Sequence, residues 1–86
     1  MDREEYIENL LDVIHKKYKV YLFNEGEMPN LITLSPKMCD TLINYFQLQE
    51  FTTIFGMKIL ISSEVDDFNK IGIYRIERPD EWKNII

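Results

Sequence analysis

Two stripes of apolar residues at helical spacing place the strongest constraint on what this chain can fold into. The first stripe follows Asp2 and Glu5, whose spacing is that of a helix-capping box. Its members recur every three or four residues: Ile7, Leu10, Leu11, Ile14 and Tyr18. The second follows Ser35-Pro36, a favoured pair at a helix start, and consists of Cys39, Leu42, Ile43 and Phe46. We expect helices over residues 3–17 and 36–48, each with one face to bury.

Four other segments are rich in β-branched and aromatic residues, which favour strands. They cover residues 18–23, 31–34, 52–62 and 71–77. The third contains Gly56, which predicts a bulge or a close backbone approach inside the strand. Residues 24–30 have the composition of a loop, and residues 63–70 that of an acidic turn joining the last two strands into an antiparallel hairpin. Residues 80–86 form a short tail that Trp82 could anchor as one helical turn.

The expected element order is therefore α-β-β-α-β-β. We predict an α+β fold with two helices packed on a three- or four-stranded, mainly antiparallel sheet, because this arrangement buries both stripes at once. The 86 residues suffice for a single domain, 1–86. Cys39 is the only cysteine, so the core must hold without an intrachain disulfide. A lone thiol fits a reducing compartment, and we expect a cytoplasmic protein.

The charge of the chain bears on its partners. Ten basic and fifteen acidic residues give a net charge of −5, with no visible basic stripe. Because nucleic acids and anionic membranes attract lysine and arginine, both are poor candidate partners. The acidic start of the chain is unlike a secretion signal, and no apolar run is long enough to cross a bilayer. Another protein, one with a basic surface, fits this charge better.

Residue types that carry catalysis are scarce in this sequence. His15 and Cys39 are the only histidine and the only cysteine, so a Cys-His nucleophile would need this one pair. A buried cysteine on an apolar stripe is more often an inert part of the core. Zinc would need three or four ligands of these kinds, and no phosphate-binding glycine motif is present. We therefore expect no enzyme activity, no metal site and no cofactor.

The densest group of carboxylates is Glu64, Asp66 and Asp67, with Phe68 directly after them. Its spacing differs from that of an EF-hand loop, so calcium binding is not indicated. A charged loop with an aromatic side chain suits partner binding, since charge steers association and aromatic anchors supply affinity. The alternative is that Phe68 folds back onto the core and the loop is structural. A second acidic group, Glu25 and Glu27, could extend the patch if the fold brings the two together.

Aromatic residues on expected strands offer one more hypothesis. Tyr21, Phe23, Phe55 and Tyr74 could form a base-stacking platform of the kind found in RNA-recognition domains. The consensus of that family is missing and the net charge has the wrong sign, so core packing is the favoured role. The apolar 52–62 segment suggests a different contact. Unpaired at a sheet edge it would invite aggregation, and a homodimer that pairs this edge is one remedy.

Residues 29–66 also show a pattern known from other proteins. Pro29-Asn30-Leu31-Ile32-Thr33-Leu34-Ser35-Pro36, a helix, and then a glycine-led apolar strand ending at Ser62 resemble a segment of tailed-phage capsid subunits. The pattern is also similar to small uncharacterised proteins of phages and prophages of Gram-positive bacteria. The resemblance transfers no catalytic residues. It implies a phage-encoded, non-enzymatic protein that binds and inhibits a host protein or defence system; the alternative is a small structural or assembly protein of a phage particle.

Overall fold

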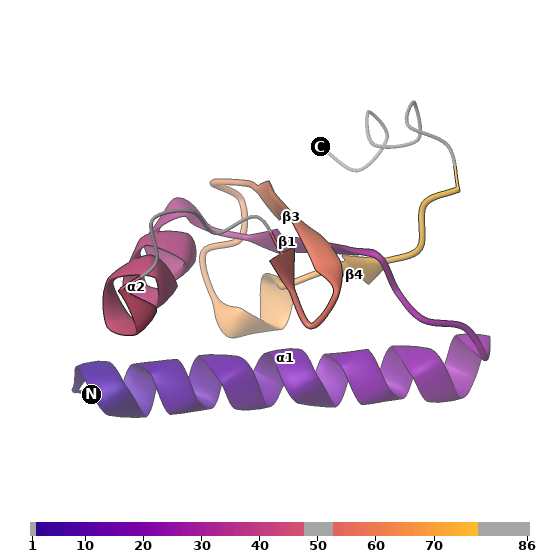
Figure 1. Ribbon diagram of the computed structural model, residues 1–86, viewed down its shortest axis with the longest axis horizontal. Helices are drawn as coiled ribbons and strands as arrows, with labels where there is room; N and C mark the ends of the chain where they lie inside the picture. The colour runs from indigo at the N-terminus through magenta and orange to yellow at the C-terminus, as the bar shows by residue number, and fades with distance from the viewer. Residues whose placement is uncertain (1, 48–52, 78–86) are drawn as a thin grey trace.

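The computed structural model describes residues 2–47 and 53–77, and in this part the chain forms a sheet covered on one face by helices (Figure 1). The order of the elements is α1 (Arg3–Glu25), β1 (Leu31–Leu34), α2 (Pro36–Phe46), β2 (Thr53–Ile54), β3 (Met57–Ile61), the 3₁₀ turn η1 (Phe68–Lys70) and β4 (Ile73–Tyr74). The predicted α+β class is confirmed. The predicted mainly antiparallel sheet is only partly right, because the sheet is mixed.

Helix α1 is longer than the sequence indicated, and the strand expected at residues 18–23 is wrong. Asp2 caps its start by accepting a hydrogen bond from the Glu5 amide at 2.8 Å. No glycine or proline interrupts the helix before Gly26, which ends it in a left-handed conformation with φ 69°. The strand preference of residues 18–23 is worth only a few tenths of a kcal/mol per residue. Extending an existing helix by one hydrogen bond per residue outweighs that preference.

Strand β1 lies in the middle of the sheet, whose strand order is β2-β3-β1-β4. It pairs in parallel with β3, from Leu31 opposite Lys58 to Leu34 opposite Ile61. On its other side it pairs antiparallel with β4. All four of its residues are buried, as expected of a strand with neighbours on both sides. The predicted hairpin between residues 52–62 and 71–77 is therefore wrong, because β1 separates β3 from β4.

Residues 53–61 form a hairpin of two strands, where the sequence predicted one strand with a bulge at Gly56. Phe55 and Gly56 make the turn, and both have positive φ, at 50° and 79°. Two consecutive residues of positive φ are the mark of a tight two-residue hairpin turn. Residues 71–77 likewise contain a shorter strand than expected, Ile73–Tyr74. The expected tail at residues 80–86, with Trp82, lies outside the described residues.

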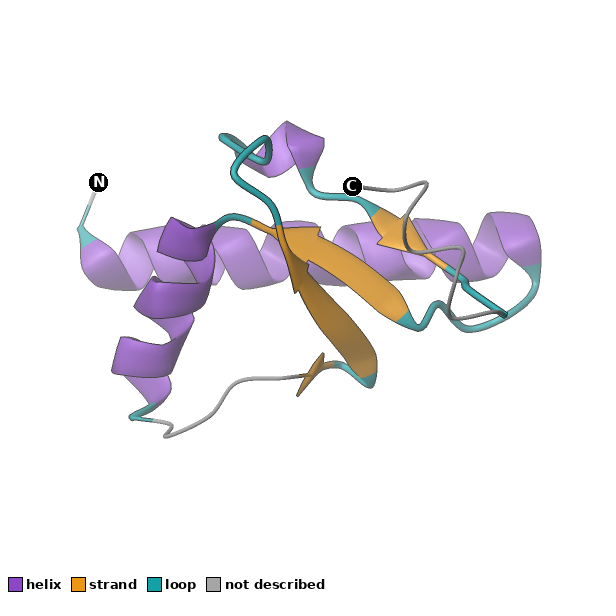
Figure 2. Cartoon of the chain, turned by 90° about the horizontal axis from the view of Figure 1, so that it is seen from above, coloured by secondary structure: helices purple, strands orange, loops and turns teal. Residues whose placement is uncertain are grey.

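The core joins both helices to one face of the sheet. Helix α1 contributes Ile7, Leu10 and Ile14 from its first half, and α2 contributes Met38, Cys39 and Leu42. From the sheet, Ile32, Leu34 and Met57 face them. Viewed from above, α1 runs beneath the strands along the length of the molecule and α2 crosses its line at a steep angle (Figure 2). None of the buried residues of α1 comes from its second half.

The two halves of α1 should therefore contribute unequally to stability. Leu10 is fully buried, whereas Leu22 is 40% exposed. We expect Leu10→Ala to lower the free energy of unfolding by about 3–5 kcal/mol, since it leaves a cavity in the core. The matched change Leu22→Ala should cost less than about 1 kcal/mol. Urea denaturation followed by circular dichroism measures both, and equal losses would contradict this assignment of the core.

Candidate protein-binding surface

Exposed apolar side chains gather around the second half of α1 and the neighbouring β2–β3 turn. Phe23 is 89% exposed, Phe55 50% and Leu22 40%. Leu22 and Phe55 line a shallow apolar pocket together with His15, Tyr18 and Lys19. Single exposed apolar residues are ordinary, but a group of them marks an interaction surface. The aromatic and β-branched residues among positions 18–23 are also the ones that predicted a strand there.

Phe55 is held in a conformation that costs free energy. Its φ of 50° lies in the left-handed region, where a residue with a side chain loses about 1–2 kcal/mol. Asparagine is the usual residue at this place in a two-residue hairpin turn, with glycine after it as here. The Phe55 ring lies 6.0 Å from the ring of His15, between centroids, and half of its surface remains in solvent. A strained, exposed aromatic residue is typical of functional positions.

The charges of α1 are divided along its length. Its first half, with the capping residue, carries Asp2, Glu4, Glu5, Glu8 and Asp12 against a single Arg3, whereas Lys16, Lys17 and Lys19 follow in its second half. Lys16 pairs with Asp12 at 3.0 Å, and both side chains are largely exposed. The exposed apolar residues of α1 therefore lie beside positive charge, although the protein as a whole is acidic.

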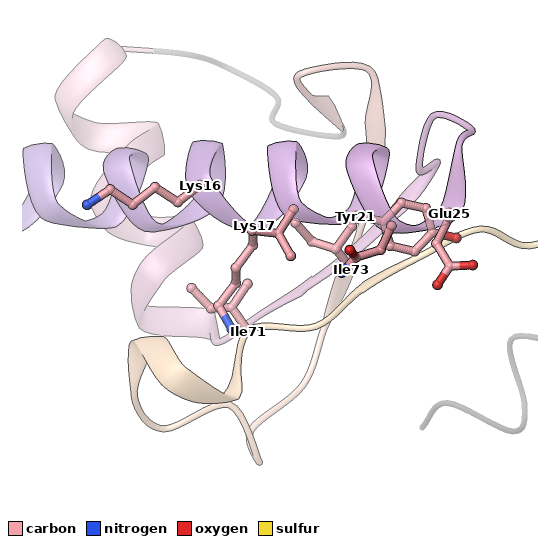
Figure 3. A pocket seen from close by; sticks show the side chains of 8 residues that line it. Lys16, Lys17, Tyr21, Glu25, Ile71 and Ile73 are labelled. Carbon is pink, nitrogen blue, oxygen red and sulfur yellow. The ribbon is translucent and has the colours of Figure 1, made fainter.

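A groove runs along the other side of the same half-helix, between α1 and β4. Figure 3 shows Lys17, Tyr21 and Glu25 of α1 following one another beside Ile71 and Ile73. Lys16, Val20 and Asn24 complete its lining. The pKa of Tyr21 is raised, first by burial of its hydroxyl and then by Glu25 and Glu27, while the positive charge of Arg75 and, to a lesser extent, a hydrogen bond from its backbone act in the opposite direction. Lys17 donates a hydrogen bond to the Asn69 carbonyl at 3.3 Å.

The predicted site at residues 64–68 is brought together in one loop, but its side chains serve the loop itself. Phe68 is half-buried against the core, and its ring lies 5.3 Å from that of Tyr6. Asp67 accepts a hydrogen bond from the Asn69 amide at 2.7 Å and so caps η1. Asp66 pairs with Lys70 at 2.9 Å, which lowers the pKa of this carboxyl. These contacts agree with the structural alternative for Phe68, while Glu64 remains exposed.

The two acidic groups do not form one patch. Phe68 lies against Tyr6 near the start of α1, whereas Glu25 is the last residue of that helix. At a rise of about 1.5 Å per residue along the helix, Tyr6 and Glu25 are roughly 28 Å apart. A partner that binds at residues 64–68 would therefore not reach Glu25 and Glu27 through the same small contact.

The remaining candidate residues of the sequence have different surroundings from one another. Cys39 is buried in the core, where burial and, to a lesser extent, Asp40 raise the pKa of its thiol. His15 is exposed beside Phe55. The aromatic platform considered above is not formed on strands, because Tyr21 and Phe23 belong to α1, and the favoured core packing is wrong for Phe23 and Phe55, which are exposed. Within residues 2–47 and 53–77, no three His, Cys, Asp or Glu side chains gather closely enough to hold a metal ion.

Comparisons with known proteins assign no family to this chain. No protein-family model, curated protein or solved structure matches this chain. Among the helices in the described part of the chain, none combines the length and the apolar character needed to cross a membrane.

The burial of Phe68 can be tested against that of Phe23. We expect Phe68→Ala to lower the free energy of unfolding by about 1–3 kcal/mol, because the ring is half-buried between Tyr6 and the core. Phe23→Ala, which removes a ring that is 89% exposed, should change it by less than about 0.5 kcal/mol. Chemical denaturation of both variants measures this difference. If Phe68→Ala left the stability unchanged, the hypothesis that the 64–68 loop presents Phe68 to a partner would be favoured instead.

Proposed function

We propose that this chain is a non-enzymatic protein-binding module whose main contact surface is the apolar pocket that Tyr18, Lys19 and Leu22 of α1 form with Phe55 of the β2–β3 turn. The observation that carries the proposal is Phe55. The chain keeps an exposed aromatic ring at a turn position where asparagine would be less strained. Where a different residue would make the turn more stable, an exposed aromatic side chain in its place indicates a role in activity.

The neighbours of Phe55 fit the same purpose. Leu22 and Tyr18 provide apolar surface beside the ring, and Lys19 provides charge at its border. Interfaces combine aromatic anchors with such a charged rim. The rim beside Phe55 is basic, so an acidic partner surface complements it. A partner with a basic surface, as the net charge of −5 suggests, would instead meet the acidic loop at Glu64, Asp66 and Asp67.

For the biological role, we propose a phage-encoded inhibitor that acts in the cytoplasm of a host bacterium by binding a host protein. The resemblance of residues 29–66 to phage proteins and the small acidic chain support this role. The alternative is a structural or assembly protein of a phage particle, which would bind virion components or pair with itself. A homodimer belongs to this alternative, and the edge on which it would form is shorter than the sequence predicted, because β2 pairs with Met57 and Lys58 of β3 in the described part of the sheet.

The decisive variant is Phe55→Asn, which should separate stability from binding. It places the preferred residue at the turn, so the free energy of unfolding should stay within about 1 kcal/mol of the wild-type value or rise. Capture of a protein from a lysate of a Gram-positive host by the immobilised chain should nevertheless fall at least tenfold. Phe46→Asn is the matched control, because Phe46 is 48% exposed on α2, and it should leave capture unchanged.

The identity of what is captured distinguishes the two roles. A host protein at a fixed stoichiometry supports the inhibitor. Virion proteins, or a dimeric or larger mass by light scattering, support the assembly protein. Equal capture by wild-type protein and Phe55→Asn would contradict the proposed surface, and no capture above background would contradict the protein-binding function.

A further inference from the structure

Strand β4 lies at the edge of the sheet opposite Phe55. The strand order β2-β3-β1-β4 leaves β4 at that edge, next to the groove along α1 in Figure 3. The backbone of residues 72–74 is held firmly against β1. Thr33 donates its amide to the Gly72 carbonyl at 2.9 Å, and its Oγ1 accepts from the Gly72 amide at 2.9 Å. The Asn30 amide donates to the Tyr74 carbonyl at 2.9 Å.

These bonds fix the direction of the intervening residue. In an antiparallel pair, successive residues turn their N–H and C=O alternately toward the partner strand and away from it. Since the carbonyls of Gly72 and Tyr74 point toward β1, the N–H and C=O of Ile73 point away from β1, to the side of β4 on which residues 2–47 and 53–77 place no further strand. The Ile73 side chain faces α1, where it lines the groove with Ile71 and Val20. The edge thus offers a hydrogen-bonding backbone and an apolar wall at the same place.

The two ends of the groove differ in charge. Lys17 reaches Ile71 at one end, where Lys16 extends away from Ile71 and pairs with Asp12, and Glu25 lies at the other end, beyond Tyr21 (Figure 3). An added strand that runs antiparallel to β4 has its C-terminal end at Lys17. The charges therefore favour a segment that is acidic toward its C-terminal end and neutral or basic toward its N-terminal end.

We propose that this groove binds an extended segment of a partner protein, acidic toward its C-terminal end, as a fifth strand on β4. Binding of this kind takes its affinity from backbone hydrogen bonds and its specificity from alternate side chains. Here the outward groups of Ile73 would bond the segment's backbone, Val20 and Ile71 would contact its apolar side chains, and Lys17 would meet its carboxylates. The inference rests on the proposed protein-binding function but concerns a different surface, so each can fail alone.

The test titrates the full chain, labelled with ¹⁵N, with a synthetic octapeptide of alternating valine and threonine. The peptide has a lysine at its N-terminal end and two aspartates at its C-terminal end. We expect amide shifts concentrated on residues 16–25 and 71–75. A peptide with the charged ends exchanged, and one with a central proline, should each bind at least tenfold more weakly. Equal binding of the exchanged peptide, or shifts centred elsewhere, would overturn the proposal.

Substitutions in the protein, in place of changes in the peptide, also test the groove. Ile73→Pro removes an N–H that points away from β1, a position where edge strands tolerate proline, and should weaken binding at least tenfold. Val20→Glu, at a side chain that is 58% exposed, should do the same without touching the strand. Lys16→Glu with Lys17→Glu should abolish the preference between the two charged peptides. The control Arg3→Glu with Lys37→Glu, which makes the same charge change away from the groove, should keep it.

Light scattering completes the test, because a second copy of the chain could also pair with β4. A dimer that Ile73→Pro converts to a monomer would show that the edge serves self-association, and would overturn the peptide proposal. Peptide binding that Val20→Glu and Ile73→Pro leave unchanged would overturn it as well. If peptides fail while Phe55→Asn still abolishes capture of a partner, the groove is wrong and the proposed function stands.

Discussion

The packing of the first half of α1 against β1 is the interaction on which the rest of the structure depends. Ile7, Leu10 and Ile14 meet Ile32 and Leu34 in one buried cluster, and the members of α2 join the same cluster. Each of these side chains contributes roughly 1.5–3 kcal/mol when it is fully buried. Because that half of the helix anchors α1, the second half can continue beneath the sheet without a buried side chain of its own. The candidate binding surface exists for this reason.

Local signals in the sequence predicted the elements that have clear ends and one apolar face. Asp2, Ser35 and Pro36 mark helix starts whose capping bonds the structure shows, and β1 has the predicted limits. The error at residues 18–23 arose because a run of aromatic and β-branched residues has the same composition in a strand and on an exposed helix surface. Only the absence of a helix-ending residue before Gly26 could have separated the two. Strand pairing was beyond local signals, because it depends on which segments α2 brings side by side.

The candidate site was harder to predict for the same reason. The sequence predicted a partner-binding site at Glu64, Asp66, Asp67 and Phe68, because charge and an aromatic ring are adjacent there along the chain. The fold uses three of these residues internally, through Tyr6, Asn69 and Lys70. The surface with exposed rings joins His15 and Leu22 of α1 to Phe55, residues distant in sequence. One local signal was available: Phe55-Gly56 between two apolar segments stands where Asn-Gly would be expected in a hairpin.

The position of β1 at the centre of the sheet also sets an order in which the chain can assemble. Its partners lie far downstream, since Leu31 pairs with Lys58 on one side and with Tyr74 on the other. As the chain emerges during synthesis, β1 has no strand to pair with until residues 57–61 have appeared. Helix α1 precedes it and can form at once from local contacts, which close faster than distant ones. The first half of a preformed α1 would then shelter the apolar face of β1 during that interval, which gives this half of the helix a role in folding as well as in the finished structure.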